Sequence, residues 1–192
     1  EQSDTFRTKV TRHTMLHEDF GRFFGALPKD AHPMPVCAAA VGALSTFYDA
    51  PEDEASINTA VIRLLAKMPT IASYSYKHSI GQPRLYPRND LDYSPNFLRM
   101  MFGNPCEDYE VSPLVAKTLE TLLILHVDHE QNCSTSTVRM VASSGANMYA
   151  AVAAGVNALS GPKHGGANQA VLEMLQFIRD SGMTTKEFVR KV

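Results

Sequence analysis

The hydrophobic positions along the chain recur with the spacing of helices. Between residues 57 and 67 the apolar side chains, such as Val61 and Leu64, recur three or four residues apart, as on one face of a helix. A proline disfavours helical geometry in the residue before it, so we predict that this helix ends at Pro69 and that another covers 71–77. No alternating run is long enough for a strand of a sheet. The pattern predicts an all-α fold.

Further helices follow from the same spacing and from the positions of proline and glycine. The predicted ranges are 37–48, 93–102, 113–125, 134–159 and 165–179. Ser112 is expected to cap the helix that begins with Pro113. The hydroxyl residues at 134–137 are expected to cap the alanine-rich helix, which packs inside a bundle, and Cys133 to be buried. Residues 81–90, with a glycine and two prolines, are predicted to form a loop.

Composition and charge exclude several classes of protein. The chain has 192 residues with 18 Lys and Arg against 20 Asp and Glu, a net charge of −2, so it lacks the basic footprint of a nucleic-acid-binding protein. No apolar run reaches the ~18 residues that span a bilayer, and the first residues do not resemble a signal peptide. Three scattered cysteines, Cys37, Cys106 and Cys133, fit reduced thiols. We therefore expect a cytoplasmic protein with no membrane or nucleic-acid partner.

One group of chemically active residues lies between 126 and 132. His126 and His129 are three residues apart and can share one face of a helix end. With Glu130 they could bind a metal, although the order differs from the His-Glu-x-x-His zinc motif. Alternatively, the rings satisfy buried carbonyl groups, or they recognise a polar substrate. The residues alone leave these three interpretations open.

A second group is the run Gly161-Pro162-Lys163-His164-Gly165-Gly166-Ala167-Asn168. It places His164 in a tight turn at the start of a helix, where the helix dipole favours a neutral imidazole. A neutral imidazole can donate a hydrogen bond to a developing enolate. The alternative is that the glycines only provide unusual backbone angles and that His164 is exposed.

Together the two groups resemble the citrate synthase family. The resemblance covers His126-x-Asp128-His129-Glu130-Gln131-Asn132, Ser134-Thr135-Ser136-Thr137-Val138-Arg139 and the glycine-rich run around His164. The runs at 12–15, 67–70, 79–83 and 86–91 resemble the bacterial, hexamer-forming branch. Citrate synthases are about twice as long, and this chain begins without Met, so we expect it to be the central part of a longer protein.

The resemblance implies a multi-helical fold with a large domain and a smaller one that closes over the substrates. Residues 1–164 would be part of the large domain, and residues 165–192 the truncated start of the small one. In the family, an aspartate removes the methyl proton and arginines bind the carboxylates, and both would follow Val192. We therefore expect the isolated chain to be inactive. The full-length protein is expected to form homodimers or hexamers built from dimers.

The resemblance also implies the reaction, an acyl transfer that condenses acetyl-CoA with oxaloacetate and water to give citrate and CoA. This is the entry step of the tricarboxylic acid cycle. His164 would be the catalytic histidine that hydrogen-bonds the thioester carbonyl, and His129, Asn132 and His126 would bind oxaloacetate. Acetyl-CoA is a substrate, so neither a cofactor nor a metal is expected. The alternatives are a 2-methylcitrate synthase that uses propionyl-CoA, and a non-catalytic helical binding or assembly module.

Some members of the hexameric branch bind NADH at an allosteric site. The positions here that match this site are Arg12, His13, Thr14, Met15, Tyr48, Arg63, Lys67, Asn89 and Cys106. Arginine and lysine suit the phosphates of an anionic dinucleotide. Alternatively, Arg12 and Lys67 are solvated or ion-paired and Met15 belongs to the core.

Overall fold

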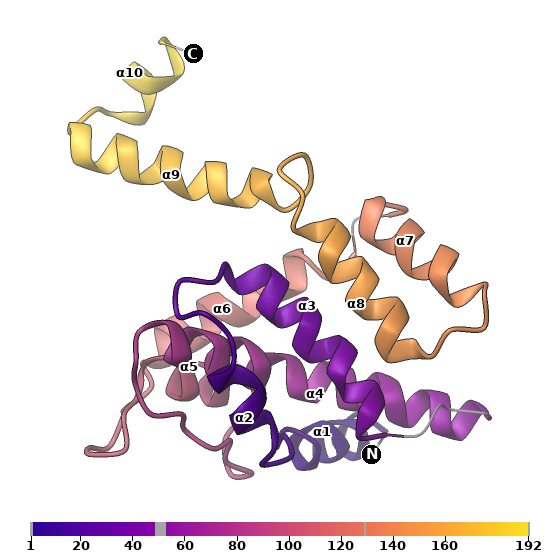
Figure 1. Cartoon of the computed structure of the whole chain (residues 1–192). Coiled ribbons are helices and arrows are strands. Elements are labelled where there is room, and N and C mark those ends of the chain that lie inside the picture. Colours follow the sequence, from indigo (N-terminus) through magenta and orange to yellow (C-terminus); the bar gives the residue numbers. More distant parts are fainter. Residues whose placement is uncertain (1, 49–52, 129, 192) are drawn as a thin grey trace.

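The computed structural model describes residues 2–48, 53–128 and 130–191, and these ranges contain helices and no strand (Figure 1). The helices are α1 (Gln2–Arg12), α2 (Phe20–Gly25), α3 (Pro33–Ala43), the 3₁₀ turn η1 (Leu44–Thr46), α4 (Glu54–Ser79), α5 (Tyr93–Phe102), α6 (Pro113–Leu125), α7 (Cys133–Ala142), α8 (Met148–Leu159), α9 (Gly166–Ser181) and α10 (Thr185–Val189). The predicted all-α class is confirmed. None of the helices in these ranges is long and apolar enough to cross a membrane.

The core lies where α2, α3, α4 and α8 meet. Helix α3 packs against both α4 and α8, and α1 and α2 lie against α4. Fully buried apolar side chains of this core come from different helices, among them Phe20 and Phe24 from α2, Val41 from α3, Ile71 from α4 and Tyr149 from α8. The core therefore joins the N-terminal part of the chain to the helix that precedes the glycine-rich run.

Helix α4 does not end at Pro69, contrary to the sequence prediction, and its 26 residues run without a break from Glu54 to Ser79. Proline lacks the N–H that would bond to the carbonyl four residues earlier, which is that of Leu65. The Tyr93 hydroxyl of α5 donates to this carbonyl at 3.1 Å. Ser73 in turn donates its hydroxyl to the Pro69 carbonyl at 2.7 Å. A tertiary contact thus replaces the missing hydrogen bond.

The single helix predicted over 134–159 is also wrong, because the chain reverses between α7 and α8. Gly145 has φ +80, a left-handed conformation that favours glycine. Asn147 then caps α8, and its Oδ1 accepts from the Ala150 N–H at 2.9 Å. Two short helices therefore pack side by side (Figure 1).

The small residues of this region permit the close approach of the two helices. A Cβ on Gly155 of α8 would lie 2.5 Å from Cγ2 of Val138 on α7, closer than side chains can pack. Helix α8 has buried residues, as expected, but α7 has none among its described residues. The small side chains of this region thus let α7 and α8 pack closely as a pair, instead of forming one long buried helix.

The other boundaries follow the sequence to different degrees. Helices α5 and α6 have the predicted bounds, but the Ser112 side chain makes no capping hydrogen bond, contrary to expectation. Helix α3 begins at Pro33, four residues before the predicted start, because the His32 Nδ1 accepts from the Met34 N–H. Helices α1, α2 and α10 were not predicted. Helix α1 buries no residue and the other two are short, so they lack a clear apolar period.

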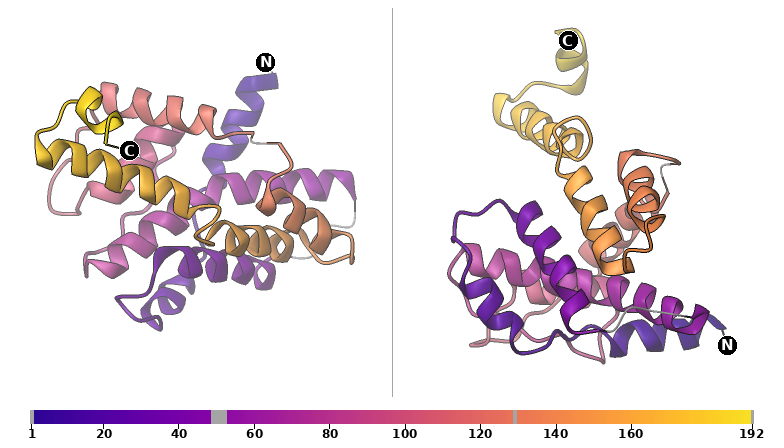
Figure 2. Two further views of the ribbon diagram at one scale, coloured as in Figure 1. Left: turned by 90° about the horizontal axis from the view of Figure 1, so that it is seen from above. Right: turned by 45° about the vertical axis from the view of Figure 1, so that its right-hand side comes forward.

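The C-terminal helices α9 and α10 extend away from the rest of the structure (Figure 1; Figure 2, right). Gly182, in the left-handed conformation with φ 66, ends α9. No residue of α9 or α10 is buried. The glycine-rich run is therefore the junction between the helical body and a projecting helix.

Asn147 should stabilise α8 measurably through its cap. Replacing Asn147→Ala in the full-length protein removes the acceptor for the Ala150 N–H, so the free energy of unfolding should fall by about 1 kcal/mol. Ser112→Ala is the matched control, because that side chain makes no capping bond and its loss should cost less than about 0.5 kcal/mol. Denaturant unfolding of both variants measures the difference, and equal losses would contradict the assigned caps.

Candidate active site

The first predicted group lies where α6 ends and α7 begins. His126 is the C-cap of α6, is exposed, and has its Nδ1 2.7 Å from the Leu122 carbonyl oxygen. Glu130 has a left-handed φ of 59, and its N–H donates to Asp128 Oδ1 at 2.9 Å. His129 lies outside the described residues. The ring of His126 thus contacts a carbonyl, as one interpretation expected, but at an exposed position.

Asn132 is the N-cap of α7, and its Oδ1 accepts from the Thr135 N–H at 3.0 Å. The cap is therefore Asn132 and not, as the sequence predicts, one of the hydroxyl residues at 134–137. Cys133 was expected to be buried, but it is exposed because it opens a helix that has no buried residue among those described. The amide before the helix therefore does the capping, which leaves the hydroxyl of Ser134 available for another contact.

The glycine-rich run folds into a compact turn between α8 and α9. The His164 N–H donates to the Gly161 carbonyl at 3.0 Å, and the Gly165 N–H donates to the Leu159 carbonyl at 2.9 Å. A Cβ on Gly165 would lie 2.2 Å from that same carbonyl oxygen, so no larger residue fits there. The φ of Gly165 is an ordinary −67. Space, and not an unusual backbone angle, is therefore what requires glycine at this position.

The side chain of His164 is held by a residue 30 positions earlier in the chain. Its Nε2 lies 2.9 Å from the Ser134 hydroxyl, in the first turn of α7, and the ring is half-buried. If the hydroxyl donates to Nε2, the single proton of a neutral imidazole lies on Nδ1. The sequence does not indicate this role of Ser134, because the serine-threonine run also fits a helix start and only the fold brings it to His164.

His164 also lies at the N-terminal end of a 16-residue helix, α9, which begins two residues later. The two predicted groups thus meet at the first turn of α7, where Asn132 caps the helix and Ser134 contacts His164. This arrangement suits the donation of a hydrogen bond to an oxygen that gains negative charge.

The residues predicted to bind NADH gather mainly around Tyr48. The guanidinium carbon of Arg63 lies 4.1 Å from the centre of the Tyr48 ring, and Lys67 Nζ lies 5.5 Å from it. Lys67 is only 3% exposed, and its ammonium donates to the carbonyls of His13, at 2.9 Å, and Met15. The Thr70 hydroxyl donates to the Thr14 carbonyl at 2.8 Å. Helix α4 thus holds residues 13–15 beside two cations.

The charge of Lys67 is not compensated by a carboxylate. Within the described ranges, its ammonium takes part in none of the ion pairs. Burial, and next the positive charge of Arg63, lower the pKa of Lys67 to about 8. Burial also raises the pKa of Tyr48. The cluster is therefore cationic below about pH 8 and less so above it.

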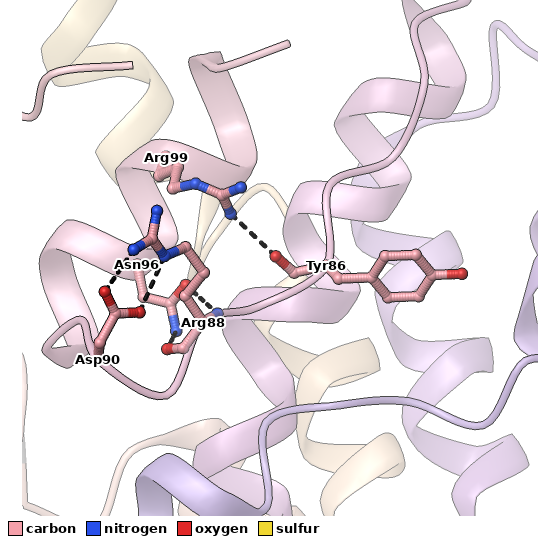
Figure 3. Close-up of polar contacts among 5 residues, drawn as sticks. All are labelled: Tyr86, Arg88, Asp90, Asn96 and Arg99. Carbon is pink, nitrogen blue, oxygen red and sulfur yellow. Dashed lines mark hydrogen bonds and ion pairs between the residues drawn. The ribbon is translucent and has the colours of Figure 1, made fainter. Parts of the chain in front are cut away.

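The loop that contains Asn89 is held against α5 by hydrogen bonds (Figure 3). The Arg88 N–H donates to Asn96 Oδ1 at 3.0 Å, and Asn96 Nδ2 donates to the Arg88 carbonyl at 2.8 Å. Arg88 also pairs with Asp90, and Arg99 donates to the Tyr86 carbonyl at 2.9 Å.

We call residues 13–15, Tyr48, Arg63 and Lys67 the Tyr48 cluster. The remaining predicted NADH positions lie apart from it. Arg12 and Asn89 line a cavity of about 360 Å³ between α1 and the loop that contains Asn89. Cys106 is exposed in a separate turn, where its N–H donates to Asn104 Oδ1 at 3.0 Å. The structure thus brings Tyr48, Arg63, Lys67 and the 13–15 segment together and pairs Arg12 with Asn89.

Comparisons with known proteins agree with the helical fold and with the family that the sequence resembles. The family model described as "Citrate synthase, C-terminal domain" matches residues 1–192. Citrate synthase 1 of Mycobacterium tuberculosis is 58% identical over 195 residues, which is 100% of this chain and 45% of that protein. Citrate synthase of Corynebacterium glutamicum is 53% identical over 191 residues, covering 97% of this chain and 44% of that protein. The chain thus spans less than half the length of these relatives.

Solved structures give the same result. A crystal structure of citrate synthase from Pyrobaculum aerophilum superposes with a TM-score of 0.76 at 36% identity, covering 87% of this chain and 43% of that one. The structure from Thermotoga maritima has a TM-score of 0.77 at 29% identity, covering 98% and 48%.

The turn that holds His164 should depend on one glycine and not on its neighbour. Gly165→Ala forces a Cβ against the Leu159 carbonyl and should lower the free energy of unfolding of the full-length protein by about 2 kcal/mol. In Gly166→Ala, the nearest atom to the new Cβ is Pro162 Cβ at 3.5 Å, an ordinary contact, so stability should be nearly unchanged. Thermal and denaturant unfolding compare the two. An unchanged Gly165→Ala protein would refute the packing described.

Proposed function

This chain belongs to the citrate synthase family, and we propose that it forms part of an enzyme that condenses acetyl-CoA with oxaloacetate and water, giving citrate and CoA. The observation that carries this proposal is the 2.9 Å contact between Ser134 and His164 at the start of α9. It gives the ring of His164 a fixed orientation in the glycine-rich turn. The relatives at 53–58% identity are named citrate synthases, which favours acetyl-CoA over the propionyl-CoA of a 2-methylcitrate synthase.

The role of His164 follows from the chemistry of the first step. Loss of a methyl proton from a thioester leaves an enolate whose negative charge lies largely on the carbonyl oxygen. With Ser134 donating to Nε2, the Nδ1–H of His164 is free to donate to this oxygen. The hydrogen bond is stronger in the transition state than in the ground state, so it accelerates the step. His164 is thus the catalytic residue and Ser134 a positioning residue.

Oxaloacetate binds, in this proposal, beside the same turn of α7. His126 ends α6, Asn132 begins α7, and His129 lies between them in the sequence. The contact from Ser134 brings His164 to this helix start, so both substrates would meet there. The reaction forms a carbon–carbon bond and hydrolyses a thioester without a redox change, so acid–base groups and hydrogen bonds suffice and no cofactor is proposed.

Residues 165–192 are the start of the small domain in this proposal, and residues 1–164 belong to the large one. Helix α9 begins two residues after His164 and projects from the other helices (Figure 1), which supports a domain boundary there. Closure of the small domain would exclude water from the thioester. The full-length enzyme is proposed to be a cytoplasmic homodimer or a hexamer of dimers.

Turnover by the full-length enzyme tests the role of the pair. His164→Ala should lower kcat by about 10²- to 10³-fold, the usual cost of losing one donor to an oxyanion. Ser134→Ala should lower kcat by about tenfold with little change in KM, because it removes one hydrogen bond that orients the ring.

Thr137→Ala, one turn along α7, is the control for this experiment. Its hydroxyl donates to the Cys133 carbonyl within the helix, so turnover should stay near that of the unmodified enzyme. Release of the CoA thiol from acetyl-CoA and oxaloacetate is the measurement. A folded His164→Ala enzyme with normal turnover would exclude this mechanism.

We also propose that the Tyr48 cluster binds NADH as an allosteric effector. Arg63 and Lys67 supply two positive charges near the Tyr48 ring, which suits a ligand with phosphates and aromatic bases. Arg12 and Asn89 line a separate cavity at the end of α1, apart from the Tyr48 cluster.

The affinity for NADH should depend on pH through Lys67. Because its pKa is lowered to about 8, Lys67 is charged at pH 7 and mostly neutral at pH 9, so NADH should bind about tenfold more weakly at pH 9. Titration calorimetry on the full-length protein gives both dissociation constants. Arg63→Gln should weaken NADH binding at both pH values and leave the tenfold difference between the two dissociation constants unchanged. Lys67→Gln should make the two dissociation constants equal. Equal affinity at pH 7 and pH 9 would contradict the role of Lys67.

A further inference from the structure

A further cavity with basic residues in its lining shares none of the residues assigned to the two proposed sites. It has a volume of about 440 Å³ and is bordered by α2, the C-terminal part of α4 and the start of the 81–90 loop. Lys29, His78 and Arg84 line it, and none of the nine NADH positions does. A volume of this size holds a small metabolite. We propose that this cavity binds the phosphate group of such a metabolite.

Arg84 is placed in the cavity by two neighbours that leave its charge uncompensated. Its guanidinium carbon lies 5.5 Å from the centre of the Tyr74 ring. Its other neighbour is Gly21 of α2, where a Cβ would come within 2.9 Å of Nη2. Within the ranges that the structure describes, Arg84 pairs with no carboxylate. The absent side chain at position 21 therefore makes room for a cation that has no protein counter-ion.

Lys29 approaches from the segment after α2. Its ammonium lies 3.8 Å from the position that a Cβ on Gly81 would occupy, and it too forms no ion pair with a described carboxylate. His78 of α4 lines the same cavity, and its Nε2 is held 3.0 Å from the Leu27 carbonyl oxygen. Two cations that form no ion pair with a described carboxylate thus line the same cavity as the imidazole rings of His17 and His78.

Glu18 is the one carboxylate that lines the cavity within the described residues. Its Oε2 accepts from the Tyr86 hydroxyl at 3.0 Å, so it is already engaged, and it forms no pair with Lys29 or Arg84. The cavity keeps an excess of positive charge. The basic groups come from three separate segments, which suits the tetrahedral oxygens of a phosphate better than the planar fork of a carboxylate.

Binding of simple anions to the full-length protein tests this proposal without any use of catalysis. Titration calorimetry with inorganic phosphate and with glycerol 3-phosphate compares a free anion with a phosphate ester. A dissociation constant in the millimolar range or below for either compound supports the site. Binding should fall at least fivefold in Arg84→Gln and in Lys29→Gln. Lys186→Gln on α10 also removes one positive charge, but far from the cavity, and should bind as the unmodified protein does.

Gly21→Ala is a second variant that keeps every charge and displaces only the Arg84 guanidinium, so it should also weaken binding. It serves if Arg84→Gln does not fold. The proposal is overturned if neither phosphate compound binds, if the cavity variants bind as Lys186→Gln does, or if succinate binds as tightly as glycerol 3-phosphate. Because no turnover is measured, failure here leaves the proposed condensation reaction untouched.

Discussion

The contact of Gly165 with the carbonyl of Leu159 is the constraint on which the candidate active site depends. It closes the turn between α8 and α9 so tightly that a Cβ would lie 2.2 Å from an oxygen. This loop brings His164 to the first turn of α7, where the Ser134 hydroxyl contacts Nε2 of its ring. That meeting needs α7 and α8 to lie close together, which Gly155 permits by leaving space for Val138. Two glycines, Gly155 and Gly165, and the hydroxyl of Ser134 thus determine the position of the His164 ring.

Helix α4 has a comparable role for the rest of the described structure. Its passage through Pro69 depends on Tyr93, whose hydroxyl satisfies the Leu65 carbonyl. Along its length it presents Lys67 to residues 13–15 and, two to three turns later, Lys77, which is fully buried and donates to Gln82 Oε1 at 2.7 Å and to the Gly103 carbonyl. Both lysines bind backbone or amide oxygens instead of carboxylates. One continuous helix therefore positions the proposed effector cluster and one wall of the phosphate cavity.

The sequence predicted the elements whose signals are local. Helices α5 and α6 have strong apolar patterns between clear turn residues, and their bounds agree with the structure. The wrong helix boundaries occur where a residue distant in the sequence matters. Helix α4 continues through Pro69 because the Tyr93 hydroxyl bonds the Leu65 carbonyl. The chain reverses at Gly145 because α8 packs against α7 and α3. Among the site residues, the motif indicated His164, but only the fold identifies Ser134 as its partner. The capping of α7 by Asn132 was missed because four adjacent hydroxyl residues compete for that role in sequence.

We propose that Ser134 and the glycine turn orient His164 toward a thioester oxygen. A crystal structure of the full-length protein with oxaloacetate and an unreactive analogue of acetyl-CoA would show this orientation. We expect the Nδ1 of His164 to lie about 3 Å from the oxygen that replaces the thioester carbonyl, with Nε2 still bonded to Ser134. A complex in which another group holds that oxygen, while His164 points elsewhere, would contradict it.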